Sequence, residues 1–206
     1  MKRSAIVLAG GFSRRFKQDK GLLVLGGKPL ILHTINRISA VVDEVIVVVN
    51  SKNQEESYTN FLPSNVEVVV DKCETQSPLV GALTGFGSVG GQYSLLLPCD
   101  TPLISSEVVS LLLELCVNKD AVIPRWPNGY LEPLQAAYHV KSALAAATKA
   151  LEDNKLNMYS MIACLKKVRY VSTSVFRQMD PKLLTFLNVN TPEDLRKADS
   201  MLQSAG

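Results

Sequence analysis

The sequence lacks the cysteine spacing that a structural metal site requires. It has four cysteines in 206 residues, and no two of them form a C-x-x-C pair. Because two thiolates must reach the same ion, we do not expect a zinc site. We interpret all four as free thiols in a reducing compartment. They are Cys73, Cys99, Cys116 and Cys164.

Long runs of one kind of residue are also missing. The formal net charge is +3 and no five consecutive residues are Lys or Arg, which argues against nucleic acid as a partner. The apolar stretch from Ala5 to Ala9 is too short for the core of a signal peptide. No apolar stretch approaches the length of a membrane span. We therefore expect a cytoplasmic protein that binds neither nucleic acid nor membrane.

Aromatic residues are few, at 6%, but hydrophobic residues make up 47% of the chain, as in ordinary globular proteins. The length of 206 residues predicts one domain over residues 1–206. Short apolar runs predict strands at 4–8, 44–49, 66–70, 93–97, 120–124, 134–138, 167–171 and 186–189. Helices are expected at 30–42, 54–62, 79–89, 142–151 and 158–165, after Ser105 or Ser106, and from Thr191 onward.

The alternation of strands with helices predicts the fold class. Most of the strands are continuous hydrophobic runs, which is typical of strands buried on both faces. We therefore expect a three-layer α/β/α protein with a mostly parallel, Rossmann-like sheet. Ligands bind such sheets outside the carboxyl ends of the strands. The residues that follow predicted strands are therefore candidates for a site: Gly10 and Gly11, Asn50, Asp71 and Asp100.

The loop after the first predicted strand has the composition of a phosphate-binding loop. Gly10 and Gly11 allow backbone N–H groups to approach a phosphate closely. Ser13 adds a hydroxyl donor, and Arg15 and Lys20 supply positive charge. The loop lacks both the Walker pattern and G-x-G-x-x-G, which argues against a dinucleotide-binding dehydrogenase. The alternative interpretation is a basic surface turn.

Two aspartates follow predicted strands and are candidates for a magnesium site. Asp100, in Pro98-Cys99-Asp100-Thr101-Pro102, is well placed to hold Mg²⁺ against phosphates. It also has an ordinary interpretation, as the cap of the turn before the next helix. Asp71 is a candidate for a second metal-shell or ribose ligand, or for a simple turn residue.

Three further polar residues are candidates on the other side of the site. Asn188 and Asn190 alternate in an expected extended segment, so both amides would face the same way. A helix cap at Thr191 is the competing explanation for this segment. Glu132 borders a turn, where it either flanks an acceptor site or forms an exposed salt bridge.

Together these segments resemble the molybdenum cofactor guanylyltransferase family, the MobA type. The family pattern is L-A-G-G-x-S-x-R-[MF]-G-x-D-K, followed by G-K-P-L and then by shorter motifs that also appear here in order. The matching segments are Leu8-Ala9-Gly10-Gly11, Ser13, Arg15-Phe16, Asp19-Lys20, Gly27-Lys28-Pro29-Leu30, Asn50, Asp71, Pro78-Leu79-Val80-Gly81, Pro98-Cys99-Asp100-Thr101-Pro102, Glu132-Pro133-Leu134 and Asn188-Val189-Asn190-Thr191-Pro192-Glu193-Asp194-Leu195. The resemblance covers almost the whole chain. It departs at Lys17 and Ser77, where the family usually has glycine.

The resemblance implies a nucleotidyltransferase of glycosyltransferase-A-like fold that passes GMP from GTP to the phosphate of molybdopterin already carrying molybdenum. The N-terminal part would bind the nucleotide and the C-terminal part the acceptor, with Mg²⁺ as cofactor. The implied nucleotide-binding residues are Leu8, Ala9, Gly10, Gly11, Ser13, Lys20, Asn50, Asp71 and Asp100. The implied catalytic residues are Arg15, Lys20 and Asp100, the metal ligands Asp100 and Asp71, and the acceptor-binding residues Glu132, Asn188 and Asn190.

The sequence leaves other functions open. A cytidylyltransferase acting on the same cofactor, or a phospholactate guanylyltransferase, would share the loop and the metal aspartate. A protein that binds nucleotide or cofactor without turnover is the alternative from another class. Loss of Lys20 or Asp100 would have favoured that alternative, and both residues are present. Proteins that hand over the cofactor are expected as partners.

Overall fold

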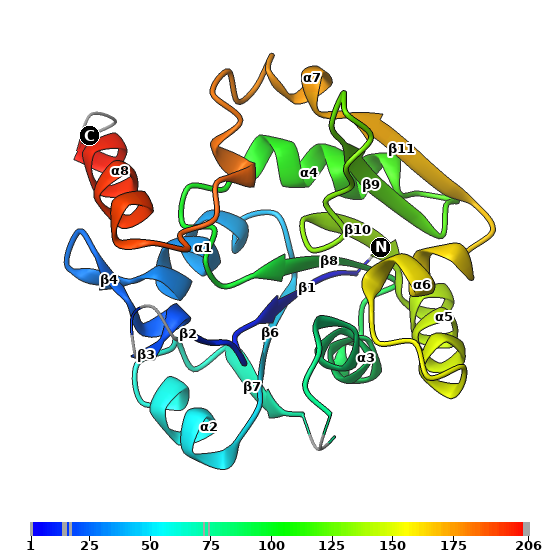
Figure 1. Cartoon of the computed structure of the whole chain (residues 1–206), viewed down its shortest axis with the longest axis horizontal. Coiled ribbons are helices and arrows are strands. Elements are labelled where there is room, and N and C mark those ends of the chain that lie inside the picture. The colour runs from blue at the N-terminus through cyan, green and yellow to red at the C-terminus, as the bar shows by residue number, and fades with distance from the viewer. Residues whose placement is uncertain (1, 14–15, 17, 72, 74, 204–206) are drawn as a thin grey trace.

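A seven-stranded sheet forms the centre of the computed structural model, which describes residues 2–13, 16, 18–71, 73 and 75–203 (Figure 1). The strand order is β11-β9-β10-β8-β1-β6-β7. All neighbouring pairs are parallel except the two that involve β10. The strands are β1 Arg3–Leu8, β6 Glu44–Val49, β7 Val66–Val70, β8 Tyr93–Pro98, β9 Ala121–Arg125, β10 Ala136–His139 and β11 Val168–Ser172. The predicted mostly parallel sheet is therefore confirmed.

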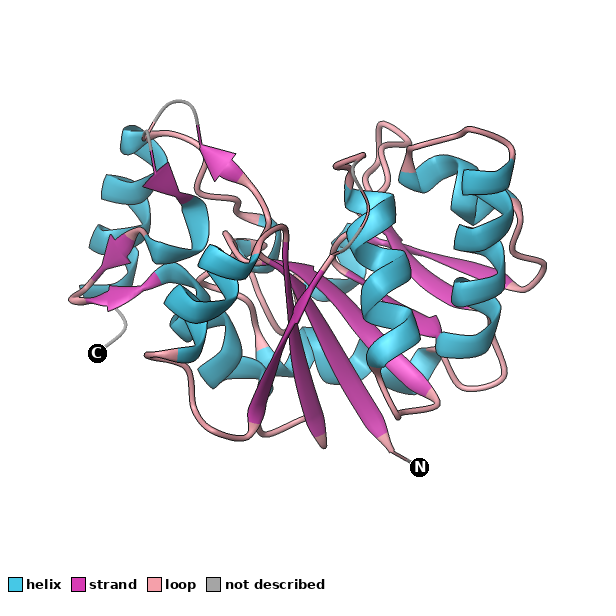
Figure 2. Cartoon of the chain, turned by 90° about the horizontal axis from the view of Figure 1, so that it is seen from below, coloured by secondary structure: helices cyan, strands magenta, loops and turns pink. Residues whose placement is uncertain are grey.

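Helices cover both faces of the sheet, and Figure 2 shows the strands fanning out between the two helical groups. Side chains alternate between the faces along each strand. Ala5 and Val7 pack with α1, α2 and α4, whereas Ile6 packs with α3, α5 and α6. The helices are α1 Leu30–Ile38, α2 Lys52–Thr59, α3 Pro78–Ser88, α4 Ser106–Leu115, α5 Val140–Glu152, α6 Met158–Ala163, α7 Thr173–Phe176 and α8 Pro192–Gln203. This arrangement confirms the three-layer α/β/α architecture.

Helix α3 lies close to the sheet because its packing face is built from small residues. A Cβ added to Gly85 would overlap Ile6, and one added to Gly81 would lie 3.3 Å from Leu8. Close packing of this kind excludes water and brings the first turn of α3 near the carboxyl ends of β1 and β6. Small residues on this face of α3 therefore permit close packing against β1.

The antiparallel strand β10 reverses the usual relation between strand ends and the site. It lies between β8 and β9, with Ala136 opposite Leu96 and His139 opposite Tyr93. Because β10 runs the other way, its amino end lies at the edge where its neighbours have their carboxyl ends. The loop that precedes β10, and not one that follows it, is therefore brought to the ligand-binding edge.

Two predictions of local structure were wrong. The segment 9–21 was expected to be a loop, but it contains the short strands β2 Phe12–Ser13 and β3 Gln18–Asp19 and the 3₁₀ helix η1 Lys20–Leu22. The segment 186–189 was expected to be a strand, but the chain forms the 3₁₀ helix η2 Leu184–Phe186 and then continues without regular structure. At that point no neighbouring strand among the described residues offers a ladder, and Val189 N–H donates instead to the carbonyl of Asp100 at 2.9 Å.

Helix boundaries differ from the expected ones by a few residues. Helix α1 ends at Ile38, four residues before the predicted end at Val42. Helix α2 begins two residues early because Ser51 accepts a hydrogen bond from the amide of Gln54 and caps it. A second short hairpin, β4 Val24–Leu25 with β5 Lys28–Pro29, precedes α1.

The C-terminal segment packs as a satellite against the main body. Leu23, Leu25 and Leu30 form a small apolar cluster with Leu103, Val189 and Ala198. The predicted threonine cap of α8 is confirmed, because the Asp194 amide donates to Thr191 Oγ1 at 3.1 Å. Within the described ranges, no helix is long and apolar enough to cross a membrane.

Candidate active site

A pocket of about 540 Å³ opens at the carboxyl ends of β1, β6 and β8. This is the edge at which open α/β sheets bind ligands. Among the predicted nucleotide-binding residues that line the pocket, four follow the ends of strands. Its walls also include the first turn of α3 and the loop before β10. The lining residues are Leu8, Gly10, Gly11, Lys20, Val48, Asn50, Gln76, Ser77, Pro78, Gly81, Pro98, Cys99, Asp100 and Leu134.

Gly10 and Asn50 form the first wall. Asn50 Nδ2 donates to the Gly10 carbonyl at 2.6 Å. A Cβ on Gly10 would overlap the Asn50 carboxamide, whereas one on Gly11 would meet nothing within 4 Å. Glycine is thus required at position 10 so that Asn50 can approach, and Gly11 keeps the rim of the pocket open.

The remaining predicted residues of this loop have different outcomes. Leu8 lines the pocket, and Ala9 is buried beneath it with its amide bonded to Val48. Ser13 lies in strand β2, paired with Gln18. Arg15 and Lys17 lie outside the described residues.

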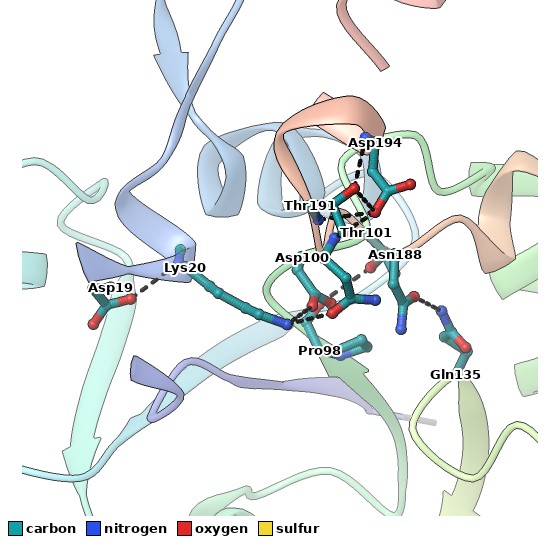
Figure 3. Close-up of polar contacts among 11 residues, drawn as sticks. Asp19, Lys20, Pro98, Asp100, Thr101, Gln135, Asn188, Thr191 and Asp194 are labelled. Carbon is teal, nitrogen blue, oxygen red and sulfur yellow. Dashed lines mark hydrogen bonds and ion pairs between the residues drawn. The ribbon is translucent and has the colours of Figure 1, made fainter. Parts of the chain in front are cut away.

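Lys20 and Asp100 form a partly buried ion pair in the pocket (Figure 3). Lys20 Nζ donates to Asp100 Oδ2 at 2.9 Å and to Asn190 Oδ1 at 2.6 Å. The Asp100 side chain is 8% exposed and that of Lys20 24%. The contacts bring together three of the predicted residues, which lie far apart in the sequence.

Asp100 has unused capacity to bind a cation. Its Oδ1 is buried and has no hydrogen-bond partner among the described residues. A buried carboxylate oxygen without a partner is costly, because it has lost its hydration. Mg²⁺ usually binds through one or two protein carboxylates together with phosphate oxygens. The chemistry of Asp100 therefore fits a divalent cation.

Cys99 lies beside Asp100 but is not a nucleophile. Burial, with the nearby Asp100 charge, raises the pKa of the Cys99 thiol well above its ordinary value. A thiol attacks as the thiolate, so this cysteine is inert at neutral pH. The side chain packs in the core on the α4 face of the sheet.

The structure does not bring Asp71 to the same place as Asp100. Asp71 follows β7, which is three strands away from β8 in the sheet. At the usual spacing this separation is roughly 14 Å, too far for one ion. Asp71 Oδ1 instead accepts from Thr84 Oγ1 at 3.2 Å and from the Cys73 amide at 3.0 Å. Asp71 lies outside the pocket lining, and no group of three or more His, Cys, Asp or Glu suited to a metal occurs in the described part of the chain.

Ser77, which stands where the resemblance predicts glycine, lines the pocket and caps α3. Its hydroxyl accepts from the Val80 amide at 3.2 Å. The first turn of α3 therefore faces the pocket with its amide end, an orientation that favours anions. This substitution is compatible with a phosphate site.

On the opposite side of the pocket, two amide groups are held with fixed polarity. Lys20 ammonium can only donate, so the Asn190 atom that it contacts must be the oxygen. Gln135 Nε2 donates to the Thr185 carbonyl at 3.4 Å and to Asn188 at 2.9 Å, so that contact must also be the oxygen (Figure 3). Neither Nδ2 group donates to a described residue in these networks, which leaves both as hydrogen-bond donors.

Gln135 is a residue of the site that sequence reasoning missed. It is 1% exposed and lies directly before β10, next to Leu134 of the pocket wall. Glu132, in the same loop, accepts from the Trp126 indole at 2.6 Å. Burial raises the pKa of Glu132, although the Trp126 hydrogen bond opposes the shift. The predicted exposed salt bridge is absent among the described contacts of Glu132, and the side chain is half-buried.

The fold and the site define a nucleotidyltransferase of the MobA-like class. A family model described as MobA-like NTP transferase domain matches residues 5–168, so the chain belongs to this family and is an enzyme. The matched segment ends before Asn188 and Asn190, which bond to Gln135 and Lys20.

Individual relatives cover nearly all of the chain. It is 36% identical over 198 residues to a "probable molybdenum cofactor guanylyltransferase" of Methanosarcina mazei, covering 94% of this chain and 88% of that protein. A second, from Methanosarcina acetivorans, is 36% identical over 208 residues, covering 98% and 91%. The solved structure of molybdopterin-guanine dinucleotide biosynthesis protein A from Archaeoglobus fulgidus superposes with a TM-score of 0.83 at 26% identity, covering 98% and 99%.

Proposed function

We propose that the enzyme transfers GMP from GTP to the terminal phosphate of molybdenum-bearing molybdopterin, releasing pyrophosphate. One observation carries the proposal: Asp100, with one oxygen on Lys20 and the other buried and unpartnered among the described residues, lies between a glycine loop and two amide donors. This arrangement is suited to two anions that must be brought together. The names of the relatives supply the base and the acceptor.

The nucleotide end of the site is the pocket wall made by β1 and β6. The amides of Gly10 and Gly11 and the ammonium of Lys20 are suited to the phosphates of GTP. Asn50, whose Nδ2 is held by the Gly10 carbonyl, presents its remaining polar atom to the nucleoside. Arg15, which the resemblance places on the phosphates, is proposed to act from the same loop.

Asp100 is the residue that would hold Mg²⁺. When bound, the ion neutralises phosphate charge and orients the reacting groups. Asp100 Oδ2 is engaged by Lys20, whereas Oδ1 has no partner among the described residues and is the oxygen left for this role. Asp71 would act at most from outside this shell, because the sheet separates it from Asp100.

The acceptor end is proposed to be formed by the loop before β10 and the segment around Asn188 and Asn190. Their two Nδ2 groups are suited to an anionic acceptor, because both carbonyl oxygens are already engaged by the protein. Glu132 lies in the same loop, where its carboxylate accepts from the Trp126 indole, and it would accept hydrogen bonds from a polar ring of the acceptor.

The chemistry requires no covalent enzyme intermediate. An oxygen of the acceptor phosphate forms a bond to the α-phosphorus of GTP, and the bond from that phosphorus to the bridging oxygen breaks as pyrophosphate leaves. Lys20 supports this step by placing positive charge against the triphosphate, and the amides of the glycine loop stabilise its phosphate oxygens. Cys99 takes no part, because its thiol stays protonated.

Calorimetric titration with GTP, CTP, ATP and UTP in the presence of Mg²⁺ tests the nucleotide. We expect GTP to bind most tightly and Asp100→Ala to lose the magnesium dependence of binding. Tighter binding of CTP would change the product to a cytosine dinucleotide. Conversion of phospholactate, but not of molybdopterin, would reassign the acceptor. If none of the four triphosphates bound, the proposal would fail.

A further inference from the structure

Asp19, the residue before Lys20, is held by two side chains of helix α2. Its Oδ1 accepts from the Tyr58 hydroxyl at 2.6 Å and from the Gly21 amide at 3.0 Å. Its Oδ2 accepts from Gln54 Nε2 at 2.6 Å. The described residues offer Asp19 no ion pair. The carboxylate is therefore satisfied by neutral donors, and both of its oxygens are used.

Gln54 connects the lysine segment to the opposite part of the pocket wall. Its Oε1 accepts from the backbone N–H of Asn50 at 2.9 Å, while its Nε2 donates to the carboxylate of Asp19. An amide N–H can only donate and a carboxylate can only accept, so the Gln54 amide has one permitted orientation. Asn50 in turn donates to the Gly10 carbonyl. Gln54 thus lies between the two segments that would hold the triphosphate.

Tyr58 makes the contact rigid. Its side chain is fully buried, and burial raises the pKa of its hydroxyl, which stays a donor. A Cβ on Gly21 would overlap the Tyr58 hydroxyl, so the backbone directly after Lys20 is pressed against this ring. The backbone on both sides of Lys20 is therefore fixed by groups that come from α2.

We propose that Gln54 and Tyr58 are positioning residues that hold Lys20 through Asp19. The proposal rests on the proposed binding of triphosphate by Lys20. Lys20 Nζ lies 2.9 Å from Asp100 Oδ2 at the end of a long, flexible side chain. The position of the Lys20 backbone therefore decides whether the ammonium group can contact the phosphates. Hydrogen bonds from supporting side chains hold a functional group close to the geometry that ligand binding requires.

Gln54 also has a purely structural explanation, which an experiment must separate from positioning. It stands three residues after Ser51, the cap of α2, and its side chain reaches back to the backbone amide of Asn50, one residue before the cap, in a variant of the capping box. Glutamate serves this capping role equally well and favours the helix dipole. Gln54→Glu therefore preserves the cap, but it sets two carboxylates against each other at the Asp19 contact.

The experiment is a cycle of three variants with calorimetric GTP titration in Mg²⁺. Asp19→Asn places two donors together in either orientation of the new amide, because Gln54 Nε2 donates at one oxygen position and the Gly21 backbone amide at the other, and Gln54 is prevented from turning by the backbone amide of Asn50. We expect Asp19→Asn and Gln54→Glu each to weaken GTP binding about tenfold, through the loss of a charge-assisted hydrogen bond. In the double variant the amide now at position 19 donates to the carboxylate now at position 54, and binding should recover to within about threefold of the wild type.

Thermal unfolding of all variants shows whether each one folds, and Tyr58→Phe, which keeps the ring, provides a second disturbance of Asp19 if a charge variant unfolds. If Gln54→Glu bound GTP as tightly as the wild type, Gln54 would act only as a helix cap and the proposal would be overturned. A double variant weaker than either single variant would do the same. A wild type that binds no triphosphate would overturn both this proposal and the proposed function, whereas normal wild-type binding with unaffected variants would overturn only the positioning.

Discussion

The two sides of the pocket are built in different ways. The proposed nucleotide side is almost contiguous, because Gly10, Gly11 and Lys20 lie in one segment and Asn50 directly follows the neighbouring strand. The proposed acceptor side joins Gln135 to Asn188 across 53 positions of the chain. A contiguous loop is specified by local geometry, whereas a long-range contact depends on the packing of everything between. Gln135 and Asn188, which do not contact Lys20, are therefore the part of the proposed acceptor side that we expect to change without disturbing the triphosphate.

Removal of Asp100 should have the largest effect, because it affects both sides. Asp100→Ala takes away the partner of Lys20 and the free carboxylate oxygen. We expect kcat/KM for pyrophosphate release to fall roughly 10³-fold. Asp71→Asn is a matched control, since Asp71 is also a buried acid just after a strand. Equal loss of magnesium dependence in both variants would show that the two carboxylates act on one ion.

On the nucleotide side, a single methyl group distinguishes two adjacent glycines. Gly10→Ala forces Asn50 to move, whereas Gly11→Ala has open space. Because a small displacement of a positioned group is costly, we expect GTP to bind roughly 100-fold more weakly to Gly10→Ala. Gly11→Ala should bind GTP within about threefold of the wild type. Equal weakening in titrations of the two variants would contradict the role given to Asn50.

On the acceptor side, a change of amide polarity should affect only one substrate. Asn188→Asp replaces the free Nδ2 donor by an anionic oxygen and keeps the shape. We expect KM for molybdopterin to rise about tenfold while KM for GTP stays unchanged. Gln135→Leu, which releases the Asn188 carbonyl, should show a weaker form of this split. A rise in both KM values would mean that the two sides are not separable.

The smallest expected effect concerns stability and pH. Burial raises the pKa of Glu132 in the folded protein. The folded state therefore favours the protonated carboxyl, and this contribution to stability is present below the unfolded pKa and lost as pH rises through the folded value. Glu132→Gln, which retains an oxygen for Trp126, should raise Tm at pH 7 by roughly 1–3 °C. Melting curves should converge at pH values below the unfolded pKa of about 4.3, and a constant difference would argue against ionisation as the cause.

Most of the sheet could be predicted from the sequence because its strands are buried on both faces. The segments 44–49 and 66–70 are uninterrupted apart from one charged residue each, and both boundaries agree with β6 and β7. The segment 186–189 has a similar apolar composition but, among the described residues, no strand to pair with. An apolar composition predicts that a segment is buried, but it does not predict whether a neighbouring strand is available for it to pair with.

The residues of the site divide along the same line. The rule that ligands lie after strands located Gly10, Asn50 and Asp100, which follow parallel strands. The same rule favoured Asp71, whose strand lies too far along the sheet. It missed Gln135, which precedes a strand. The four residues of β10 do not show that this strand runs antiparallel to its neighbours. The support of Asp19 by α2 was missed since it depends on where a separate helix packs.

The reversed strand β10 has a consequence for the order in which the protein is made. Until Ala136–His139 has been synthesised, β8 forms the open edge of a sheet composed of β1, β6, β7 and β8. That edge is apolar, with Leu95, Leu96 and Leu97 fully buried in the finished molecule. Exposed apolar edges invite pairing with other chains, and translation adds roughly 5–20 residues each second. A pause between β8 and β10 would therefore be the moment at which the nascent enzyme is most exposed to aggregation and most in need of a chaperone.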